Sequence, residues 1–219
     1  MKKLLATIIL VCTGIAAMAQ VEGVESNSKW DIGGSVAFTY NYNTNTPLHM
    51  SPSGFGIDLN TIEIQYHVGR TTMVALGLFD LMWDFRYLDK GYIFNEDGTV
   101  PEQVSVDGRA KANYRDFTFS FPVSLHQRFN SSWSMTLSVA PGVGLFSYNN
   151  NYVSPYGENS ANHKDHFFPM NNRAGFRLDI KAAVWFEDFG LTFRYRPIGS
   201  KNDRLNNVQT FSFGLTFRY

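Results

Sequence analysis

Apolar and polar residues alternate without a break from Thr210 to Tyr219. Successive side chains of a β-strand point to opposite faces. One face of this segment therefore carries Phe211, Phe213, Leu215, Phe217 and Tyr219. The opposite face carries small or polar residues and one arginine. A water-exposed edge strand this apolar would promote aggregation, whereas a strand with an apolar outer face suits a barrel surrounded by lipid.

The same period of two recurs along the chain and predicts eight strands. The predicted strands are Trp30–Tyr42, Gly56–Val68, Thr72–Leu88, Asn113–Phe129, Trp133–Tyr148, Arg173–Phe186, Gly190–Arg196 and Thr210–Tyr219. The alternation changes phase near Asn60-Thr61, which indicates a β-bulge in the second strand. We therefore expect an all-β chain with one domain.

The segments between these strands alternate in length. Three are tight turns, at Gly69–Thr71, Asn130–Ser132 and Glu187–Phe189. Four are long connections, at Asn43–Phe55, Asp89–Ala112, Asn149–Asn172 and Pro197–Asn207. Short turns at one end and long loops at the other are typical of transmembrane barrels. The sequence thus predicts an eight-stranded antiparallel up-and-down transmembrane β-barrel with both termini at the short-turn end.

Alternation alone also fits a soluble, lipocalin-like barrel with its apolar face inside. The size of the side chains separates the two interpretations, because eight strands enclose only enough space for their own side chains. The phenylalanine-rich face is the bulkier one, so we place it outside. Aromatic residues also gather at the strand ends, as expected at two membrane–water interfaces. They are Trp30, Trp133, Trp185, Phe186 and Phe189 at the short-turn end and Tyr40, Tyr42, Tyr87, Tyr148 and Tyr195 at the other.

The first twenty residues have the three regions of a secretory signal peptide. A basic start precedes an apolar stretch over Leu4–Ala17, and an Ala-x-Ala site then ends at Ala19. We expect cleavage between Ala19 and Gln20, which leaves residues 20–219 as the barrel domain. Cleavage before Cys12, as in a lipoprotein, is disfavoured by the bulky Val11. The mature chain then lacks cysteine and forms no disulfide.

Composition narrows the function further. Removal of Lys2 and Lys3 reduces the 19 basic residues to 17, against 19 acidic ones, so the mature net charge is about −2. This balance gives no basic surface for nucleic acid. Aromatic residues make up 16% of the chain, yet the mean hydropathy is only −0.20. No run of 18 apolar residues follows the signal, so helical membrane spans are not expected.

With these features the chain resembles the small outer-membrane barrels of the OmpA-transmembrane and OmpX type. It is most similar to the "outer membrane protein beta-barrel domain" proteins of Bacteroidetes. The resemblance implies a monomer in the outer membrane, in contact with its lipid and lipopolysaccharide. It also implies that the barrel assembly machinery reads the last strand at Phe213, Leu215, Phe217 and Tyr219. Most proteobacterial members end in phenylalanine, so Tyr219 is a departure from that pattern.

Charged residues on the inward face are the first candidate site. By strand parity, the lumen receives Glu63, His67, Asp80, Asp84, Arg86, His126, Arg177, Asp179, Lys181, Arg194, Arg196 and Arg218. Charges in a narrow interior are costly unless they are paired, so we expect ion-pair networks that plug the lumen. A small ion path along these groups is the alternative. We expect no large conductance.

Catalysis is the second question, because the resembling barrels include lipid A acyltransferases and deacylases. His67 and His126 are the histidines on predicted strands, and Ser124 shares a face with His126. No acidic residue clearly completes a triad. Both histidines also lie near the short-turn end, away from the outer leaflet that holds lipid A. We therefore expect no enzymatic activity and no cofactor, with a lipid A-modifying enzyme as the alternative.

The long loops are the third candidate. His163, Asp165 and His166 could hold a metal, but ligands in a loop are a weak signal, and we expect none. Asn- and Tyr-rich stretches in the loops have the composition of adaptable contact surfaces. Tyr92–Phe94 and Val104–Val106 could extend two strands above the membrane and offer an edge to a partner. The expected function is envelope structure or binding of a surface ligand through the loops.

Overall fold

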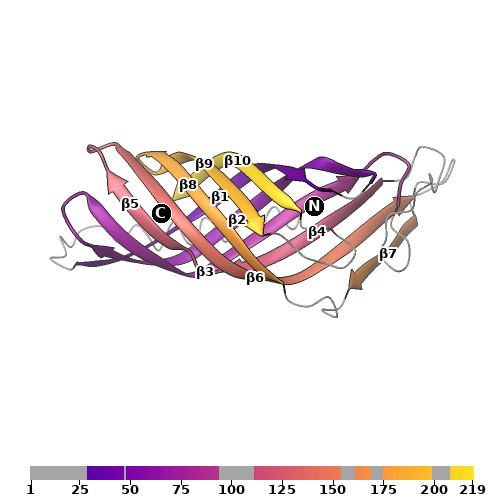
Figure 1. Ribbon diagram of the computed structural model, residues 1–219, viewed down its shortest axis with the longest axis horizontal. Helices are drawn as coiled ribbons and strands as arrows, with labels where there is room; N and C mark the ends of the chain where they lie inside the picture. Colours follow the sequence, from indigo (N-terminus) through magenta and orange to yellow (C-terminus); the bar gives the residue numbers. More distant parts are fainter. Residues whose placement is uncertain (1–28, 47, 94–110, 154–160, 169–174, 199–207) are drawn as a thin grey trace.

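The computed structural model describes residues 29–46, 48–93, 111–153, 161–168, 175–198 and 208–219. These residues form ten strands (Figure 1). The strands are β1 (Trp30–Thr44), β2 (Met50–His67), β3 (Thr72–Leu88), β4 (Lys111–Ser120), β5 (Val123–Arg128), β6 (Trp133–Val153), β7 (Ala161–Phe168), β8 (Phe176–Phe186), β9 (Phe189–Ile198) and β10 (Gln209–Arg218). Among the described residues, no helix is long and apolar enough to cross a membrane.

Antiparallel pairing closes the strands into one barrel. Around the ring, neighbouring strands pair in the order β1, β2, β3, β4 with β5, β6, β8, β9 and β10, and β10 pairs back with β1 over Ser35–Thr44. β4 and β5 lie end to end between β3 and β6, so together they form one of the eight positions around the barrel. β7 pairs only with β6 among the described strands and lies outside the ring. The prediction of an eight-stranded antiparallel barrel is therefore confirmed.

A proline divides the strand that was predicted to run from Asn113 to Phe129. Pro122 has no N–H group to donate to a ladder, so the strand is interrupted between β4 and β5. Its carbonyl still accepts a hydrogen bond from the Gly77 backbone N–H at 2.8 Å. Gly77 makes room for the proline ring, because a Cβ there would lie 2.4 Å from Pro122 Cγ. The two faces keep their phase across the break.

Bulges lie side by side in β1 and β2. The register shifts between Gly33 and Ser35, and again between Asn60 and Ile62, where the phase change of the sequence indicated a bulge. The ring of Tyr219 covers Gly34: a Cβ on this glycine would lie 2.5 Å from the tyrosine hydroxyl. That hydroxyl donates to the Thr61 carbonyl at 3.2 Å. The end of β10 is thereby connected to both neighbouring bulges.

The first connection was predicted as a long loop over Asn43–Phe55, and this prediction is wrong. β1 continues to Thr44 and β2 begins at Met50. Asn45 and His49 both have positive φ angles, of 57° and 64°, which allow the chain to reverse over a few residues. The Ser-Pro-Ser-Gly sequence over 51–54 has turn composition but forms strand, and Tyr40 Oη is 2.6 Å from Ser53 Oγ across the two strands.

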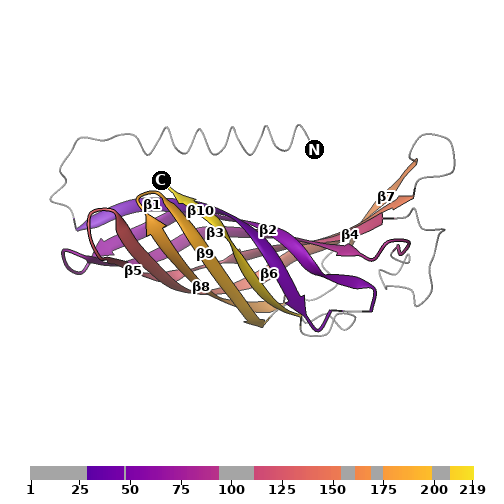
Figure 2. The ribbon, with the colours of Figure 1, turned by 90° about the horizontal axis from the view of Figure 1, so that it is seen from above.

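The loop end also carries strands beyond the barrel wall. β6 extends to Val153, past the segment that pairs with β8, and its outer part pairs with β4 on one side and β7 on the other (Figure 2). The third long connection was thus predicted as loop where the structure has strand. The extension expected from Tyr92–Phe94 and Val104–Val106 lies almost entirely outside the described residues.

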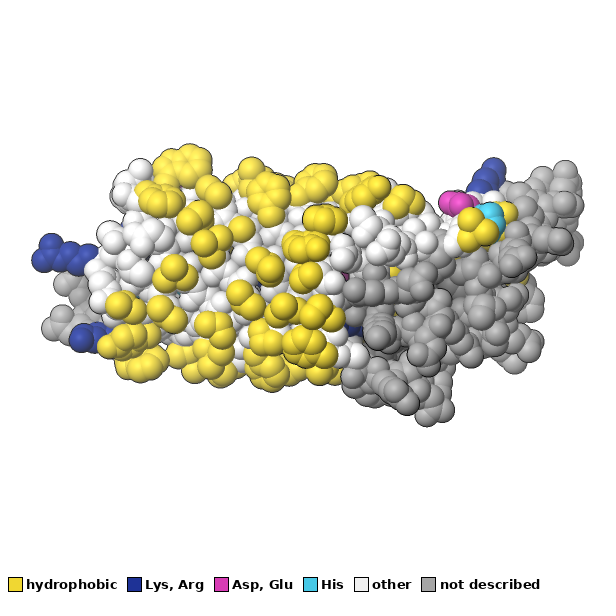
Figure 3. All heavy atoms as spheres, in the orientation of Figure 1, with side chains coloured by type: hydrophobic (Ala, Val, Ile, Leu, Met, Phe, Trp, Pro, Cys, Tyr) yellow, Lys and Arg dark blue, Asp and Glu magenta, His cyan; other side chains and the backbone are white. Residues whose placement is uncertain are grey.

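Large apolar side chains cover the outside of the barrel (Figure 3). Phe193, Leu191 and Phe213 are 53–55% exposed, whereas Thr210, Ser212 and Thr216 on the same strands' inner face are buried. Bulky groups are therefore outside, as predicted for a transmembrane barrel. Trp185 is the exception. We expected it in the outer aromatic belt, but it is 4% exposed and points into the lumen, as the parity of β8 requires.

Candidate functional site

Four charged residues form the central layer of the lumen. Arg194 donates from Nη2 to Asp84 Oδ1 at 2.6 Å. Arg196 donates from Nη1 to Asp84 Oδ2 at 2.8 Å. It also donates to both carboxylate oxygens of Asp179, from Nε at 2.8 Å and from Nη2 at 3.0 Å. Each of these side chains is at most 4% exposed. Bidentate arginine–carboxylate contacts hold both partners in fixed orientations, so this layer is a rigid cross-link between β3, β8 and β9.

A further arginine–carboxylate ion pair, between Arg177 and Asp116, lies beside that layer. Arg177 donates to both oxygens of Asp116, at 2.5 and 2.8 Å, and also contacts the Thr118 hydroxyl. Gly144 leaves space for this guanidinium, because a Cβ there would lie 2.5 Å from Arg177 Nη2. Arg86 differs from these arginines. It is 2% exposed, its Nε and Nη1 have no hydrogen-bond partner among the described residues, and its guanidinium lies 5.8 Å from the Tyr114 ring centroid.

Nearer the short turns, one lysine forms ion pairs with two carboxylates. Lys181 Nζ lies 2.7 Å from Asp58 Oδ2 and 2.9 Å from Asp80 Oδ2. Ser120 also donates to Asp80. Asp80 is fully buried, and its Oδ1 has no hydrogen-bond partner within the described ranges. Acidic groups therefore outnumber basic ones at this level of the lumen.

Glu63 and His126 form the next layer. His126 Nε2 lies 2.9 Å from Glu63 Oε1, and Nδ1 lies 2.8 Å from the Thr136 hydroxyl. Trp185 Nε1 donates to the same hydroxyl at 2.9 Å. The sequence pointed to Ser124 as the partner of His126 and to no acid. The structure instead aligns a carboxylate, an imidazole and a threonine hydroxyl, since β2, β5 and β6 bring them to one level of the lumen.

Glu63 is well satisfied by neutral donors. It accepts hydrogen bonds from Asn60 Nδ2 and Gln65 Nε2, both at 3.0 Å. Chemically, the carboxylate–imidazole–hydroxyl chain has the order of groups found in triads, in which a base is oriented by an acid. The Thr136 hydroxyl, however, is engaged on both sides, by His126 and by the Trp185 donor. The arrangement fits a packed polar network.

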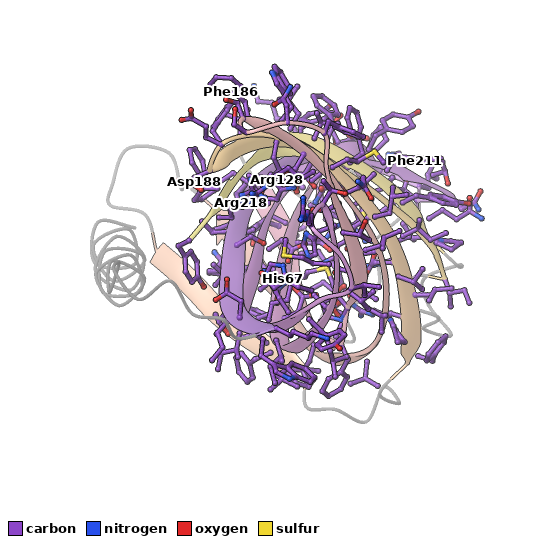
Figure 4. The ribbon with its side chains drawn as sticks, turned by 90° about the vertical axis from the view of Figure 1, so that its left-hand side faces the viewer. His67, Arg128, Phe186, Asp188, Phe211 and Arg218 are labelled. Atoms are coloured by element: carbon purple, nitrogen blue, oxygen red, sulfur yellow. The ribbon has the colours of Figure 1, made fainter. Side chains whose placement is uncertain are left out.

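The two ends of the lumen differ. At the loop end, the inner wall carries a small apolar cluster of Met50, Leu88, Ala112 and Tyr114, against which Tyr92 packs. At the short-turn end, a cavity of about 410 Å³ opens (Figure 4). Lys181 and Asp58 line its inner part, and Arg128, Arg218 and Asp188 line it near the short turns. The central arginine layer lies beyond its lining, so among the described residues the cavity ends there.

The structure places nine of the ten predicted network residues inside the barrel wall. They are Glu63, Asp80, Asp84, Arg86, Arg177, Asp179, Lys181, Arg194 and Arg196. Arg218 lies at the rim, where its Nε is 3.7 Å from Asp188 Oδ1 and its Nη2 donates to the Glu187 carbonyl at 2.5 Å. Two lumen acids, Asp58 and Asp116, were overlooked in the sequence. Strand parity was sufficient to find both, because Asp58 lies between the outward Ile57 and Leu59, and Asp116 shares its parity with Thr118 and Ser120, opposite Phe117 and Phe119.

The other predicted sites are the assembly signal, the cleavage site and the histidines of the third long connection. Phe213, Leu215 and Phe217 of the expected assembly signal are exposed on the outside of β10. Tyr219 is half-buried against Gly34. Ala19 and Gln20 lie outside the described residues. The segment with His163, Asp165 and His166 is part of β7 rather than loop, and the described residues contain no cluster of metal-binding side chains.

The charges are arranged across the lumen by sign. Five of the six lumen acids lie on β2, β3 and β4, whereas four of the five lumen arginines and lysines lie on β8 and β9. The acids on β2–β4 are Asp58, Glu63, Asp80, Asp84 and Asp116, and the bases on β8 and β9 are Arg177, Lys181, Arg194 and Arg196. The inward residues of β6, of β10 and of β1 near its loop end are small and neutral, such as Ser138, Ser212 and Asn41. The ion pairs therefore join opposite halves of the barrel, except for Arg196–Asp179, which joins the neighbouring strands β9 and β8.

Comparisons with known proteins were made for the whole chain. No protein-family model matches it, and no curated protein matches it. Among solved structures, it is similar to Ail, the attachment invasion locus protein of Yersinia pestis, crystallised with the heparin analogue sucrose octasulfate. The identity is 13%, the match covers 88% of this chain and 100% of that one, and the TM-score is 0.42.

Two further similarities have the same character. For Neisserial surface protein A (NspA) the identity is 14%, with 87% and 96% of the two chains covered and a TM-score of 0.40. For a de novo designed transmembrane β-barrel the identity is 9%, with 85% and 95% covered and a TM-score of 0.33. Because these values are low, the eight-stranded barrel rests on the strand pairing of this chain itself.

Proposed function

We propose that the protein is a non-enzymatic, integral outer-membrane β-barrel that supports the envelope and binds a surface ligand through its long loops. One observation carries the proposal: the central layer of Arg194, Arg196, Asp84 and Asp179 fills the lumen, so the barrel is a closed support. Strands β4 and β6 continue beyond the wall at the loop end and support the segment that would meet a ligand.

The lipid and biogenesis partners follow from the outer wall. Its apolar side chains would contact outer-membrane lipid and lipopolysaccharide. Ring closure pairs the wall strands on both sides, which favours a monomer. In this proposal the signal peptide is removed between Ala19 and Gln20, and the barrel assembly machinery recognises the outward residues Phe213, Leu215 and Phe217. The short turns then face the periplasm.

Orientation and location are tested with an epitope tag. The tag is placed after Asn202 in one variant and after Arg70, in a short turn, in the other. We expect both proteins in the outer-membrane fraction, with heat-modifiable mobility on gels. Only the first tag should bind antibody on intact cells, and both should bind after the cells are opened. Labelling of the Arg70 tag on intact cells, or recovery of the protein in a soluble fraction, would contradict the proposal.

A narrow channel and a lipid A-modifying enzyme are the alternatives. The layered ion pairs argue against the channel, so reconstituted protein should give no large, stable conductance steps in planar bilayers. The Glu63–His126–Thr136 chain is the observation that favours an enzyme. Mass spectra of lipid A from cells with the wild-type gene, with His126→Gln and with a deletion test this. Identical spectra support the non-enzymatic proposal, and a species lost in both mutants overturns it.

A further inference from the structure

The cavity at the short-turn end is not used by the loop-based function, and its charges are unevenly distributed. Arg128 on β5 and Arg218 on β10 line it near the short turns (Figure 4). These strands occupy opposite positions in the ring. Arg128 makes no ion pair among the described residues, and the partner of Arg218, Asp188, has a side chain that is 86% exposed. A surface ion pair of this kind is weak, so the Arg128 guanidinium and the part of the Arg218 guanidinium that does not donate to the Glu187 carbonyl are available to an anion.

The inner part of the cavity has the opposite character. Asp58 and Glu63 line it, Asp80 lies directly behind, and Lys181 is the permanent cation at this level. Asn60 also lines the cavity and is 8% exposed, and its Oδ1 has no hydrogen-bond partner in the part of the chain that the structure describes. Buried acceptors of this kind normally have a partner. The inner part therefore suits a ligand group that donates hydrogen bonds or carries positive charge.

The strand register gives the separation of the two parts. Arg218 on β10 and Asn60 on β2 both lie opposite Ser35 of β1, and Asp58 lies opposite Ala37 two residues further along. Two strand spacings and at most two residues along the strand place the backbone of Arg218 about 10–12 Å from those of Asn60 and Asp58, and the inward side chains shorten this gap toward the length of about two residues of extended peptide. A ligand of this length would present an anionic group to the arginines and a donor group to the inner acids at the same time.

We propose that this cavity binds a small zwitterion of dipeptide size, with its carboxylate between Arg128 and Arg218 and its ammonium group facing Asp58 and Asn60. The cavity volume of about 410 Å³ accommodates such a molecule. Trp185, whose ring lies 5.0 Å below the Arg218 guanidinium, holds that arginine at the cavity wall. Entry from the periplasm rests on the orientation proposed above, whereas the binding chemistry does not.

The test uses the full mature barrel in detergent micelles and three probes, followed by calorimetry or by NMR titration. Alanyl-alanine carries both charges, N-acetyl-alanyl-alanine only the anion, and alanyl-alanine amide only the cation. We expect the dissociation constant of the zwitterion to be about tenfold lower than that of either blocked form. Equal binding of the zwitterion and a blocked form, or no binding at all, would overturn the proposal.

Variants identify the cavity as the place of binding. Arg128→Gln and Arg218→Gln should each weaken alanyl-alanine binding about tenfold. Arg70→Gln is the matched control, because Arg70 is an exposed arginine in a neighbouring short turn and lies outside the cavity lining. Heat-modifiable mobility confirms that each variant is folded. Equal weakening by the control would reduce the effect to net charge and refute the site. Because binding is measured in micelles, its outcome is independent of the cell fractionation that tests the location.

Discussion

Replacing Asp84 with asparagine tests whether the central layer holds the barrel together. Asp84 is 1% exposed and accepts from Arg194, Arg196 and Asn41, at 2.6, 2.8 and 2.8 Å. The amide is nearly the same size, so packing is retained while the charge is lost. Arg194 then loses its carboxylate, and Arg196 keeps only Asp179.

The expected loss of stability in Asp84→Asn follows from the cost of leaving a buried charge without its partner. Removing one member of a buried ion pair destabilises proteins by about 3–5 kcal/mol. Arg86 adds a further positive charge beside the layer, because its Nε and Nη1 have no hydrogen-bond partner among the described residues. With a denaturant slope of about 2 kcal/mol/M, a loss of about 4 kcal/mol lowers the urea midpoint by about 2 M.

The assay is urea unfolding of the barrel in lipid vesicles, followed by tryptophan fluorescence and by heat-modifiable gel mobility. Asp188→Asn is the matched control, because it removes the same charge from a weak ion pair at the exposed rim. Its midpoint should change little. If Asp84→Asn unfolds at the wild-type midpoint, the central layer is not a structural plug, and the argument for a closed lumen is wrong.

Three further predictions test the wall and its faces. Gly77→Ala should destabilise the barrel by about 1–3 kcal/mol, because the new Cβ would collide with Pro122, whereas Gly69→Ala in an open turn should not; equal urea midpoints would contradict this. Gly34→Val should weaken the contact between β1 and Tyr219, and Tyr219→Ala should relieve part of its effect in the double variant, because the new Cβ would also lie 2.8 Å from the Asn60 carbonyl oxygen; additive losses would exclude this coupling. In variants that keep a single tryptophan, brominated lipid should quench Trp133, which is 46% exposed on the outside, but not Trp185, and equal quenching would place Trp185 in the outer belt.

The barrel itself could be predicted from the chain because alternation is a strong local signal. Side-chain parity gives the face of every residue once one residue is placed, and a single misplaced step would reverse the whole strand. Parity also placed the buried charges on the inner face, and its strict use gives the correct side for Trp185. That residue was mispredicted because its position near a turn was given more weight than its parity.

The ends of the strands could not be predicted in the same way. Ser51–Gly54 has the composition of a turn but belongs to β2, and its Ser53 and Gly54 pair with β1, because pairing depends on the partner strand and not on local propensity. β7 and the outer part of β6 were assigned to a loop for the same reason. Which lumen charges pair with one another could not be predicted from the sequence either. Glu63 meets His126 only because β2 and β5 face the lumen at one level, and that level depends on the registers of the strands between them.

The separation of the charges by sign has a consequence for how the barrel closes. The acids on β2–β4 and the bases on β8 and β9 are far apart in the chain: 110 residues separate Asp84 from Arg194, and 101 separate Asp80 from Lys181. Until the ring closes, each half would expose charges of mainly one sign, and a charge of either sign is costly in lipid without its partner. The halves therefore attract each other across the lumen, and their pairing favours closure between β1 and β10 over a partly open sheet. The same argument explains why the inward residues of β6 and β10 are small and neutral: they leave room for long arginine side chains to reach the opposite wall.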